Sequence, residues 1–163
     1  MVVVIKMKKT NASRILDKLK IPYEILEYEV DEQDLSAENA AQKMGQPLKQ
    51  VFKTLIIRGD KTGILVACIP GGAELNLKAL ASISGNKKIA LAHLKEIKSL
   101  TGYIRGGVSP SAMKKNYPTY IDESAFQFPF IIFSAGVRGL QLKVDPHDLL
   151  KAIQLISGKL TMT

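Results

Sequence analysis

Gln50-Val51-Phe52-Lys53-Thr54-Leu55-Ile56-Ile57 is a run of mostly apolar, β-branched and aromatic residues. Its length and composition predict a β-strand that is buried on both faces. Successive side chains of a strand point to opposite faces, so Lys53 shares its face with three apolar side chains, those of Val51, Leu55 and Ile57. The run therefore predicts a strand with a cation in the middle of an otherwise apolar face.

A lysine on such a face has two interpretations. Desolvating an unpaired ammonium is costly, so Lys53 could lie at an edge, where its four-carbon stem packs and its charged end reaches water. Alternatively, the fold holds Lys53 at the floor of a pocket, where its ammonium meets an anion or an ester carbonyl. The pattern alone leaves both interpretations open.

The residues on either side alternate between helical and strand-like patterns. Helical spacing and polar caps predict helices over 10–20, 37–44, 76–84, 92–101 and 146–158, with Ser36, Asn76 and Asp145 among the caps. The last two helices should turn these side chains toward the core: Leu94, Ile97, Leu100, Leu149, Leu150, Ile153 and Ile156. Further strands are predicted over 23–30, 64–69, 87–90, 118–122, 130–133 and 140–144, with a hairpin turn at 58–63. This order predicts an α+β fold with a mixed, strongly curved central sheet.

Length and composition indicate one globular domain spanning 1–163, since 46% of the 163 residues are hydrophobic and 23% are charged. Residues 1–6 could be an N-terminal extension, because Met7 could also serve as the start. No stretch is long and apolar enough to span a membrane, and one cysteine cannot form an internal disulfide, so a cytoplasmic location is expected. That cysteine, Cys68, lies in the apolar strand 64–69 and should be an inert core thiol.

The formal net charge of +8 is unevenly placed along the chain. Acidic and basic side chains cancel over residues 1–50, so the whole excess lies in 51–163. A basic surface attracts phosphate backbones or acidic partners, which makes RNA a candidate ligand. The alternative is a basic protein that binds no nucleic acid, because Lys87-Lys88 and Lys114-Lys115 are isolated pairs and not tracts.

Two loops carry the remaining candidate chemistry. Gly106-Gly107-Val108-Ser109-Pro110 contains two glycines that allow the backbone amides to approach a ligand closely, although the same pattern also occurs in simple turns. Ser134-Ala135-Gly136-Val137-Arg138-Gly139 follows the predicted strand over 130–133. His93 and His147 are isolated and are expected at the surface.

Several common catalytic patterns are missing from the sequence. It contains no Cys/His cluster for zinc, no G-x-S-x-G elbow, no P-loop and no G-x-G-x-x-G, so neither a metal nor a cofactor is expected. An enzyme with this sequence would act by positioning and polarising its substrate. Lysine, serine and backbone amides would be its tools.

Three motifs together resemble the YbaK/EbsC family of bacterial Cys-tRNA(Pro) deacylases. They are the segment 51–55, the loop 106–110 continuing into Met113-Lys114-Lys115, and the segment 133–140. They occur in the family's order, and the similarity runs from about Lys8 to Leu155. The resemblance implies the fold of this family and of the editing domains of prolyl-tRNA synthetase. In that fold a barrel-like sheet of about six to seven strands is surrounded by helices.

The resemblance also implies a reaction, trans-editing, in which cysteine is removed from mischarged tRNA(Pro). The substrate's own thiol would attack the ester carbonyl and release a cyclic thiolactone. Mischarged tRNA(Pro), bound at its acceptor end, and prolyl-tRNA synthetase are the implied partners. The oligomeric state is left open.

Site residues follow from the same resemblance. The catalytic set is Lys53, which anchors ribose or ester oxygens, Gly107, whose loop amides stabilise the oxyanion, and Ser134, which with Tyr23 orients the aminoacyl group. The implied substrate-binding positions are Tyr23, Gly106, Val108, Ser109, Gly136 and Arg138. Ser109 could instead shape the turn before Pro110, and Arg138 could meet RNA phosphate or pair with a carboxylate such as Asp145.

Three other functions are compatible with the sequence. A related deacylase could clear Ala-tRNA(Pro) by activating water. A binding module could hold tRNA or a nucleotide without chemistry. A regulatory protein would bind a partner and lack activity.

Overall fold

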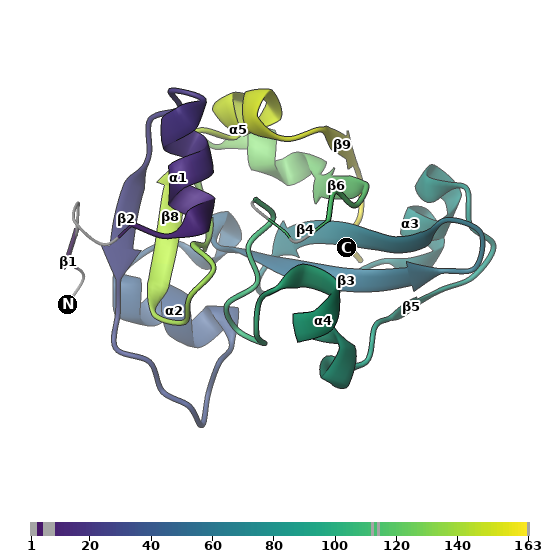
Figure 1. The fold of residues 1–163 in the computed structure, drawn as a ribbon, viewed down its shortest axis with the longest axis horizontal. Helices are drawn as coiled ribbons and strands as arrows, with labels where there is room; N and C mark the ends of the chain where they lie inside the picture. The colour runs from purple at the N-terminus through teal and green to yellow at the C-terminus, as the bar shows by residue number, and fades with distance from the viewer. Residues whose placement is uncertain (1–2, 5–8, 112, 114, 163) are drawn as a thin grey trace.

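The computed structural model of the chain describes residues 3–4, 9–111, 113 and 115–162. Two β-sheets, partly covered by helices, make up the fold (Figure 1). One sheet has the strand order β1-β2-β8-β7, with β1 at Val3–Val4, β2 at Glu24–Glu27, β8 at Leu140–Val144 and β7 at Ile131–Ser134. The other has the order β5-β3-β4-β6-β9, with β5 at Ile89–Leu91, β3 at Phe52–Gly59, β4 at Gly63–Pro70, β6 at Thr119–Asp122 and β9 at Leu155–Gly158.

The hairpin of β3 and β4 is the central element of the fold (Figure 1). It pairs residue by residue from Phe52 opposite Pro70 to Gly59 opposite Gly63. The predicted turn is confirmed, and Asp60 fixes it by accepting hydrogen bonds from the amides of Lys87 and Lys88 at 3.0 and 3.2 Å. Most of the apolar run 50–57 therefore lies in an interior strand of its sheet, with β4 on one side and β5 on the other.

The two sheets meet where β3 begins. Val51 and Ile132 form a single parallel bridge, and no longer ladder joins the two sheets within the described chain. The α+β class is confirmed, but the strands form two sheets, where the sequence and the resemblance led us to expect one curved or barrel-like sheet of six to seven strands. The hydrogen-bond ladder breaks at this corner because β3 turns there from the second sheet toward the edge of the first.

Helices pack around the sheets, and most begin at the predicted caps. They are α1 at Asn11–Lys18, α2 at Ala37–Met44, α3 at Leu77–Ser84, α4 at Ile97–Thr101 and α5 at Pro146–Ala152, with 3-10 turns at Leu48–Gln50, Leu94–Glu96 and Glu123–Gln127. Ser36, Asn76 and Asp145 accept a backbone hydrogen bond at the start of α2, α3 and α5. None of the helices in these ranges is long and apolar enough to cross a membrane.

Two predictions about helices are wrong. The last helix ends at Ala152, and residues 155–158, predicted to continue it, form β9 along the free edge of β6. Pairing with an available strand edge outweighs local helical spacing here, and both Leu150 and Ile156 are exposed. Leu94 is also exposed, because the segment predicted as one helix starts with a 3-10 turn that points this side chain outward.

The faces of β3 are as the alternation predicts. Phe52 and Ile56 belong to the large cluster between the sheets, whereas Ile57 packs under α3 with Leu80. Val51 joins a third cluster, under α2. The Lys53 side chain therefore projects from β3 between two apolar clusters, on the side where α2 and the loop after β4 approach the strand.

Candidate active site

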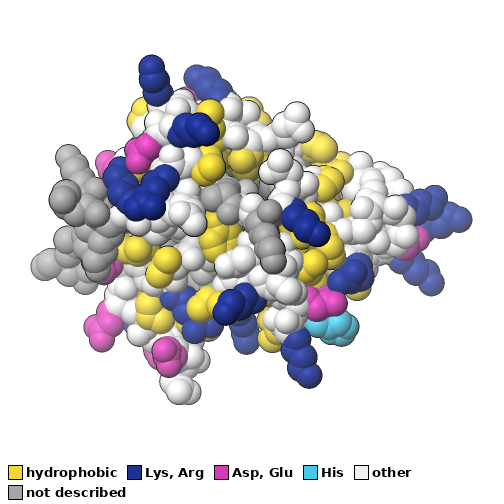
Figure 2. Space-filling model, in the orientation of Figure 1, with side chains coloured by type: hydrophobic (Ala, Val, Ile, Leu, Met, Phe, Trp, Pro, Cys, Tyr) yellow, Lys and Arg dark blue, Asp and Glu magenta, His cyan; other side chains and the backbone are white. Residues whose placement is uncertain are grey.

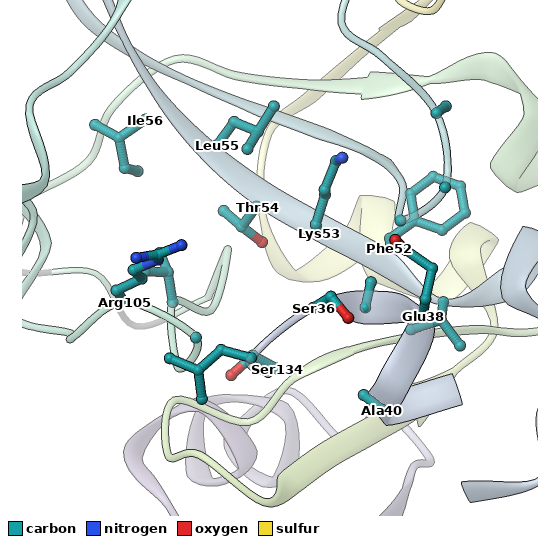
Figure 3. A pocket seen from close by; sticks show the side chains of 18 of the residues that line it. Ser36, Glu38, Ala40, Phe52, Lys53, Thr54, Leu55, Ile56, Arg105 and Ser134 are labelled. Carbon is teal, nitrogen blue, oxygen red and sulfur yellow. The ribbon is translucent and has the colours of Figure 1, made fainter. Parts of the chain in front are cut away.

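A cavity of about 530 Å³ opens along β3, a volume typical of sites for small ligands. Most of its wall comes from five segments: the start of α2, residues 51–56 at the start of β3, the loop after β4, the segment from β5 to α4, and the glycine loop (Figure 3). Tyr28, Ser134 and Gln141 complete the wall. The lining residues with polar side chains are Tyr28, Ser36, Glu38, Lys53, Thr54, Glu74, Arg105, Ser134 and Gln141.

Lys53 lines this cavity and is half-buried. Its ammonium forms no hydrogen bond or ion pair with any residue in the described part of the chain. Lys53 and Leu55 point the same way from β3, and the ammonium points away from Ser134 (Figure 3). A half-buried cation without a protein partner is available to an anionic or carbonyl oxygen of a ligand.

Ser134 and Gln141 form a second polar group at the same cavity. They are directly opposite each other on β7 and β8, and both are buried, with 8% and 6% of their surface exposed. The Ser134 hydroxyl accepts a hydrogen bond from the amide of Gly136 at 3.1 Å. The cavity wall therefore includes two uncharged polar side chains held on a pair of hydrogen-bonded strands.

The glycine loop contributes Gly106 and Val108 to the wall, but not Gly107. The amide of Gly107 is used within the loop, where it donates to the carbonyl of Ile104 at 2.9 Å. The amides of Gly106 and Val108 make no hydrogen bond to any other described residue. Gly106 has φ +82°, a left-handed conformation that favours glycine.

The two motif loops are packed against each other. Arg138 Nε donates to the carbonyl of Arg105 at 2.7 Å, and a Cβ on Gly107 would lie 3.2 Å from the backbone nitrogen of Arg138. A Cβ on Gly136 would lie 2.7 Å from the ring of Tyr103, and the Tyr103 hydroxyl donates to the carbonyl of Ser111 at 2.6 Å. Burial raises the pKa of Tyr103 to about 12, so this hydroxyl keeps its proton at neutral pH.

Arg138 thus has a contact that neither sequence-based alternative included. Asp145, one proposed partner, accepts hydrogen bonds from the amide and ring of His147 at the start of α5. Those bonds, the backbone one first, lower the pKa of the Asp145 carboxyl. Arg138 instead joins the two loops through its Nε atom.

Tyr23 and Ser109 lie outside the cavity wall, as do three other residues assigned by resemblance, Gly107, Gly136 and Arg138. The Tyr23 hydroxyl donates to Asp17 at 2.8 Å, and it is Tyr28, at the end of the same chain segment, that lines the cavity. Ser109 is fully buried and lies 3.2 Å from the hydroxyl of Ser111, which agrees with the alternative that it shapes the turn. Lys114 lies outside the described residues, and Lys115 is exposed.

Cys68 and the histidines are separate from the site. Burial raises the pKa of the Cys68 thiol to about 12, which agrees with an inert core thiol. His93 and His147 are both exposed, as predicted. Across the residues that the structure describes, no group of three or more His, Cys, Asp or Glu side chains is arranged to hold a metal ion.

Arg105, Glu38, Tyr28 and Gln141 line the cavity but were not predicted from the sequence. Arg105 directly precedes the glycine pair, so its place beside that motif was a usable signal. Glu38 and Tyr28 reach the cavity through the folding of separate segments, which no local pattern reports. Gln141 lies in the strand predicted over 140–144, and nothing in that pattern indicated that its side chain would be buried at a cavity.

Comparisons with known proteins identify the family. The model of the aminoacyl-tRNA editing domain matches residues 31–152. The chain is 50% identical over 143 residues, 88% of its length and 87% of the relative's, to EbsC of Enterococcus faecalis, named as a candidate Cys-tRNA(Pro)/Cys-tRNA(Cys) deacylase. It is 33% identical over 79 residues to a proline–tRNA ligase of Pelotomaculum thermopropionicum, matching 48% of this chain and 14% of the ligase.

A solved structure has the same fold. It is that of a candidate trans-editing enzyme for prolyl-tRNA synthetase, with a TM-score of 0.79 at 23% identity, and the match covers 96% of this chain and all of the other. The family model covers well over half of the chain, and it includes the strand that carries Lys53, the glycine loop and the loop that begins at Ser134. The chain belongs to the family of aminoacyl-tRNA editing domains.

Proposed function

We propose that this protein is a trans-editing deacylase that removes cysteine from mischarged Cys-tRNA(Pro). Family membership and the 50% identity to EbsC support the substrate class. The observation that carries the proposal is Lys53, a half-buried cation on the cavity wall whose ammonium has no partner in the described chain. A group of this kind suits an ester whose oxygens gain negative charge during cleavage.

The substrate itself would supply the nucleophile. None of the described residues that line the cavity is a cysteine or a histidine, so its serine and threonine hydroxyls have no imidazole base beside them. In the proposed step, the cysteine sulfur attacks its own ester carbonyl carbon. The carbon–sulfur bond forms, the bond to the ribose oxygen breaks, the thiol proton ends on that oxygen, and a thiolactone leaves.

Lys53 would stabilise this step electrostatically. Its ammonium is placed to contact the ester or ribose oxygens, where negative charge develops. The amides of Gly106 and Val108 are the candidate oxyanion donors, since the amide of Gly107 is already bonded to Ile104. Gly107 would act by letting its loop pack closely against Arg138, since a Cβ would lie only 3.2 Å from the Arg138 backbone nitrogen.

Ser134 would orient the aminoacyl group from the opposite side of the cavity. Its hydroxyl is anchored by the amide of Gly136 and keeps a proton for donation to the substrate. Tyr28 is better placed than Tyr23 to contact the same group, because it lines the cavity. Tyr23 would act indirectly, through Asp17 on α1.

The remainder of the tRNA would lie over the basic surface. Lysine and arginine side chains are spread across the face seen in Figure 2 and are not gathered in one patch, which suits contact with a phosphate backbone at several points. Arg105, exposed at the cavity, would meet the phosphates nearest the ester. Prolyl-tRNA synthetase is the proposed source of the mischarged tRNA, and the reaction would take place in the cytoplasm.

Deacylation of a panel of charged tRNAs tests the proposal. Cys-tRNA(Pro), Cys-tRNA(Cys), Ala-tRNA(Pro) and Pro-tRNA(Pro) are incubated with the protein, and loss of the ester is followed over time. We expect rapid loss of cysteine and retention of proline. Preferential loss of alanine would indicate water-based Ala-tRNA(Pro) editing, and binding without any loss would indicate a non-catalytic module.

A further inference from the structure

Gln141 lines the cavity, and its side chain carries a buried hydrogen-bond acceptor that no described residue uses. Its side chain is 94% buried, and its Oε1 atom has no hydrogen-bond partner in the described structure. It is the one buried side-chain oxygen or nitrogen among the described residues in that state. Leaving a carbonyl oxygen buried and unpaired is unfavourable, so a ligand that brings a donor to this atom gains binding energy.

The surroundings of Gln141 indicate the kind of donor. Its cross-strand neighbour is Ser134, and neither side chain carries a charge. The positive charge of Lys53 points away from Ser134 across the cavity (Figure 3). Lys53 is therefore suited to the oxygens of a ligand, and the uncharged pair of Ser134 and Gln141 elsewhere on the wall is suited to a cationic donor.

An aminoacyl ester contains one such donor, its α-ammonium group, which has a positive charge and three N–H bonds. We propose that the Oε1 atom of Gln141 accepts a hydrogen bond from this α-ammonium, so that Gln141 makes the enzyme selective for aminoacyl groups with a free amine. This proposal rests on the proposed function. It adds a feature of the substrate that the thiol and the ester do not specify.

The consequence is discrimination against blocked amines. An N-acetylated cysteinyl ester keeps both the thiol and the ester carbonyl, so self-cleavage remains chemically available to it. It loses the positive charge and two of the three donors, and it brings a carbonyl oxygen toward Oε1. We expect the enzyme to prefer the free amine by about 10- to 100-fold, the range of one hydrogen bond to a charged group.

The test compares kcat/KM for Cys-tRNA(Pro) and N-acetyl-Cys-tRNA(Pro) in the wild type and in Gln141→Met, which keeps the length of the side chain and removes its acceptor. We expect kcat/KM of Gln141→Met to fall about 10- to 100-fold on the free-amine substrate and to stay unchanged on the acetylated one. The ratio of the two kcat/KM values should therefore approach one. Gln141→Glu, which also serves if the methionine variant does not fold, should keep or increase the preference for the free amine.

Gln50→Leu is the matched control. Gln50 is also buried, but its carboxamide donates to the carbonyl of Phe130 and does not line the cavity. This variant should lose stability and keep the substrate ratio. Equal cleavage of both substrates by the wild type, an equal loss on both in Gln141→Met, or loss of the preference in Gln141→Glu would overturn the assignment.

A binding measurement distinguishes failure of the Gln141 assignment from failure of the proposed deacylase function. Calorimetry with 3′-cysteinylamino-3′-deoxyadenosine, whose amide is not cleaved, and with its N-acetyl derivative reports the preference without any reaction. Preference for the free amine by a protein that cleaves no ester would contradict the deacylase function and support the role of Gln141. Cleavage of Cys-tRNA(Pro) by a protein that binds both analogues equally would support the deacylase function and contradict the role of Gln141.

Discussion

Arg138 Nε lies 2.7 Å from the main-chain oxygen of Arg105, and this hydrogen bond ties the loop after β7 to the glycine loop. The first loop begins at Ser134 and the second contains Gly106 and Val108, so the bond sets the distance between two walls of the cavity. Motif residues far apart in sequence therefore act as one unit. Some of them touch the cavity, and others hold those residues in position.

Replacing Arg138 should affect catalysis more than stability. Arg138→Met removes the bond to Arg105, which should let the glycine loop move and lower kcat/KM for Cys-tRNA(Pro) about tenfold. The free energy of unfolding in urea should fall by about 1 kcal/mol. Arg14→Met, at an exposed arginine on α1, is the control and should match the wild type. Unchanged kcat/KM in Arg138→Met would show that the bond does not position the loop.

Gly136 should be intolerant of a side chain. It has φ +97°, and a Cβ would lie 2.7 Å from the Tyr103 ring. Gly85 also has a positive φ, +78°, but open space around its Cβ position. We expect Gly85→Ala to cost about 1 kcal/mol of unfolding free energy and Gly136→Ala about 2–3 kcal/mol, because only the second adds a clash to the backbone strain. Equal losses in urea titrations would contradict this packing.

Arg105 should contribute to tRNA binding through charge. Arg105→Gln removes an exposed cation at the cavity, so the dissociation constant for tRNA should rise and the salt dependence of binding should decrease by about one counterion. Arg58→Gln is the control, because the Arg58 guanidinium is already paired with both oxygens of Glu96 at 2.9 Å. Filter binding at several salt concentrations measures both slopes. Equal slopes for wild type and Arg105→Gln would exclude the phosphate contact.

Much of this site could be predicted from local patterns, because β3 and its neighbours obey them. The two-residue alternation placed Lys53 on the face of β3 that does not carry Phe52 and Ile56. The helix caps at Ser36, Asn76 and Asp145 followed from residue type alone. The strand 155–158 could not be predicted, because it depends on the free edge of β6. The place of Gln141 at the cavity could not be predicted for a similar reason, since most of the other lining segments are distant in the chain.

Cys68 should be dispensable for catalysis. Cys68→Ala should keep full deacylase activity and lose roughly 1 kcal/mol of stability at neutral pH. Burial raises the thiol pKa from 9.0 to about 12, so the thiol favours folding below pH 9 and this contribution is lost as pH rises toward 12. The stability difference between wild type and Cys68→Ala should therefore shrink over that range. A folded but inactive Cys68→Ala protein would mean that the cysteine takes part in the reaction.

Lys53 is the residue on which the proposed deacylation depends most, and single-turnover deacylation of Cys-tRNA(Pro) by folded Lys53→Met tests its role. Methionine has a similar length without the charge, so the strand should stay packed and the unfolding free energy should be equal or higher. Deacylation should fall at least about a hundredfold, as expected for losing one preorganised electrostatic group, and Lys53→Arg should not restore it, because a planar guanidinium differs in shape from an ammonium. Near-wild-type deacylation by Lys53→Met would contradict the proposed mechanism.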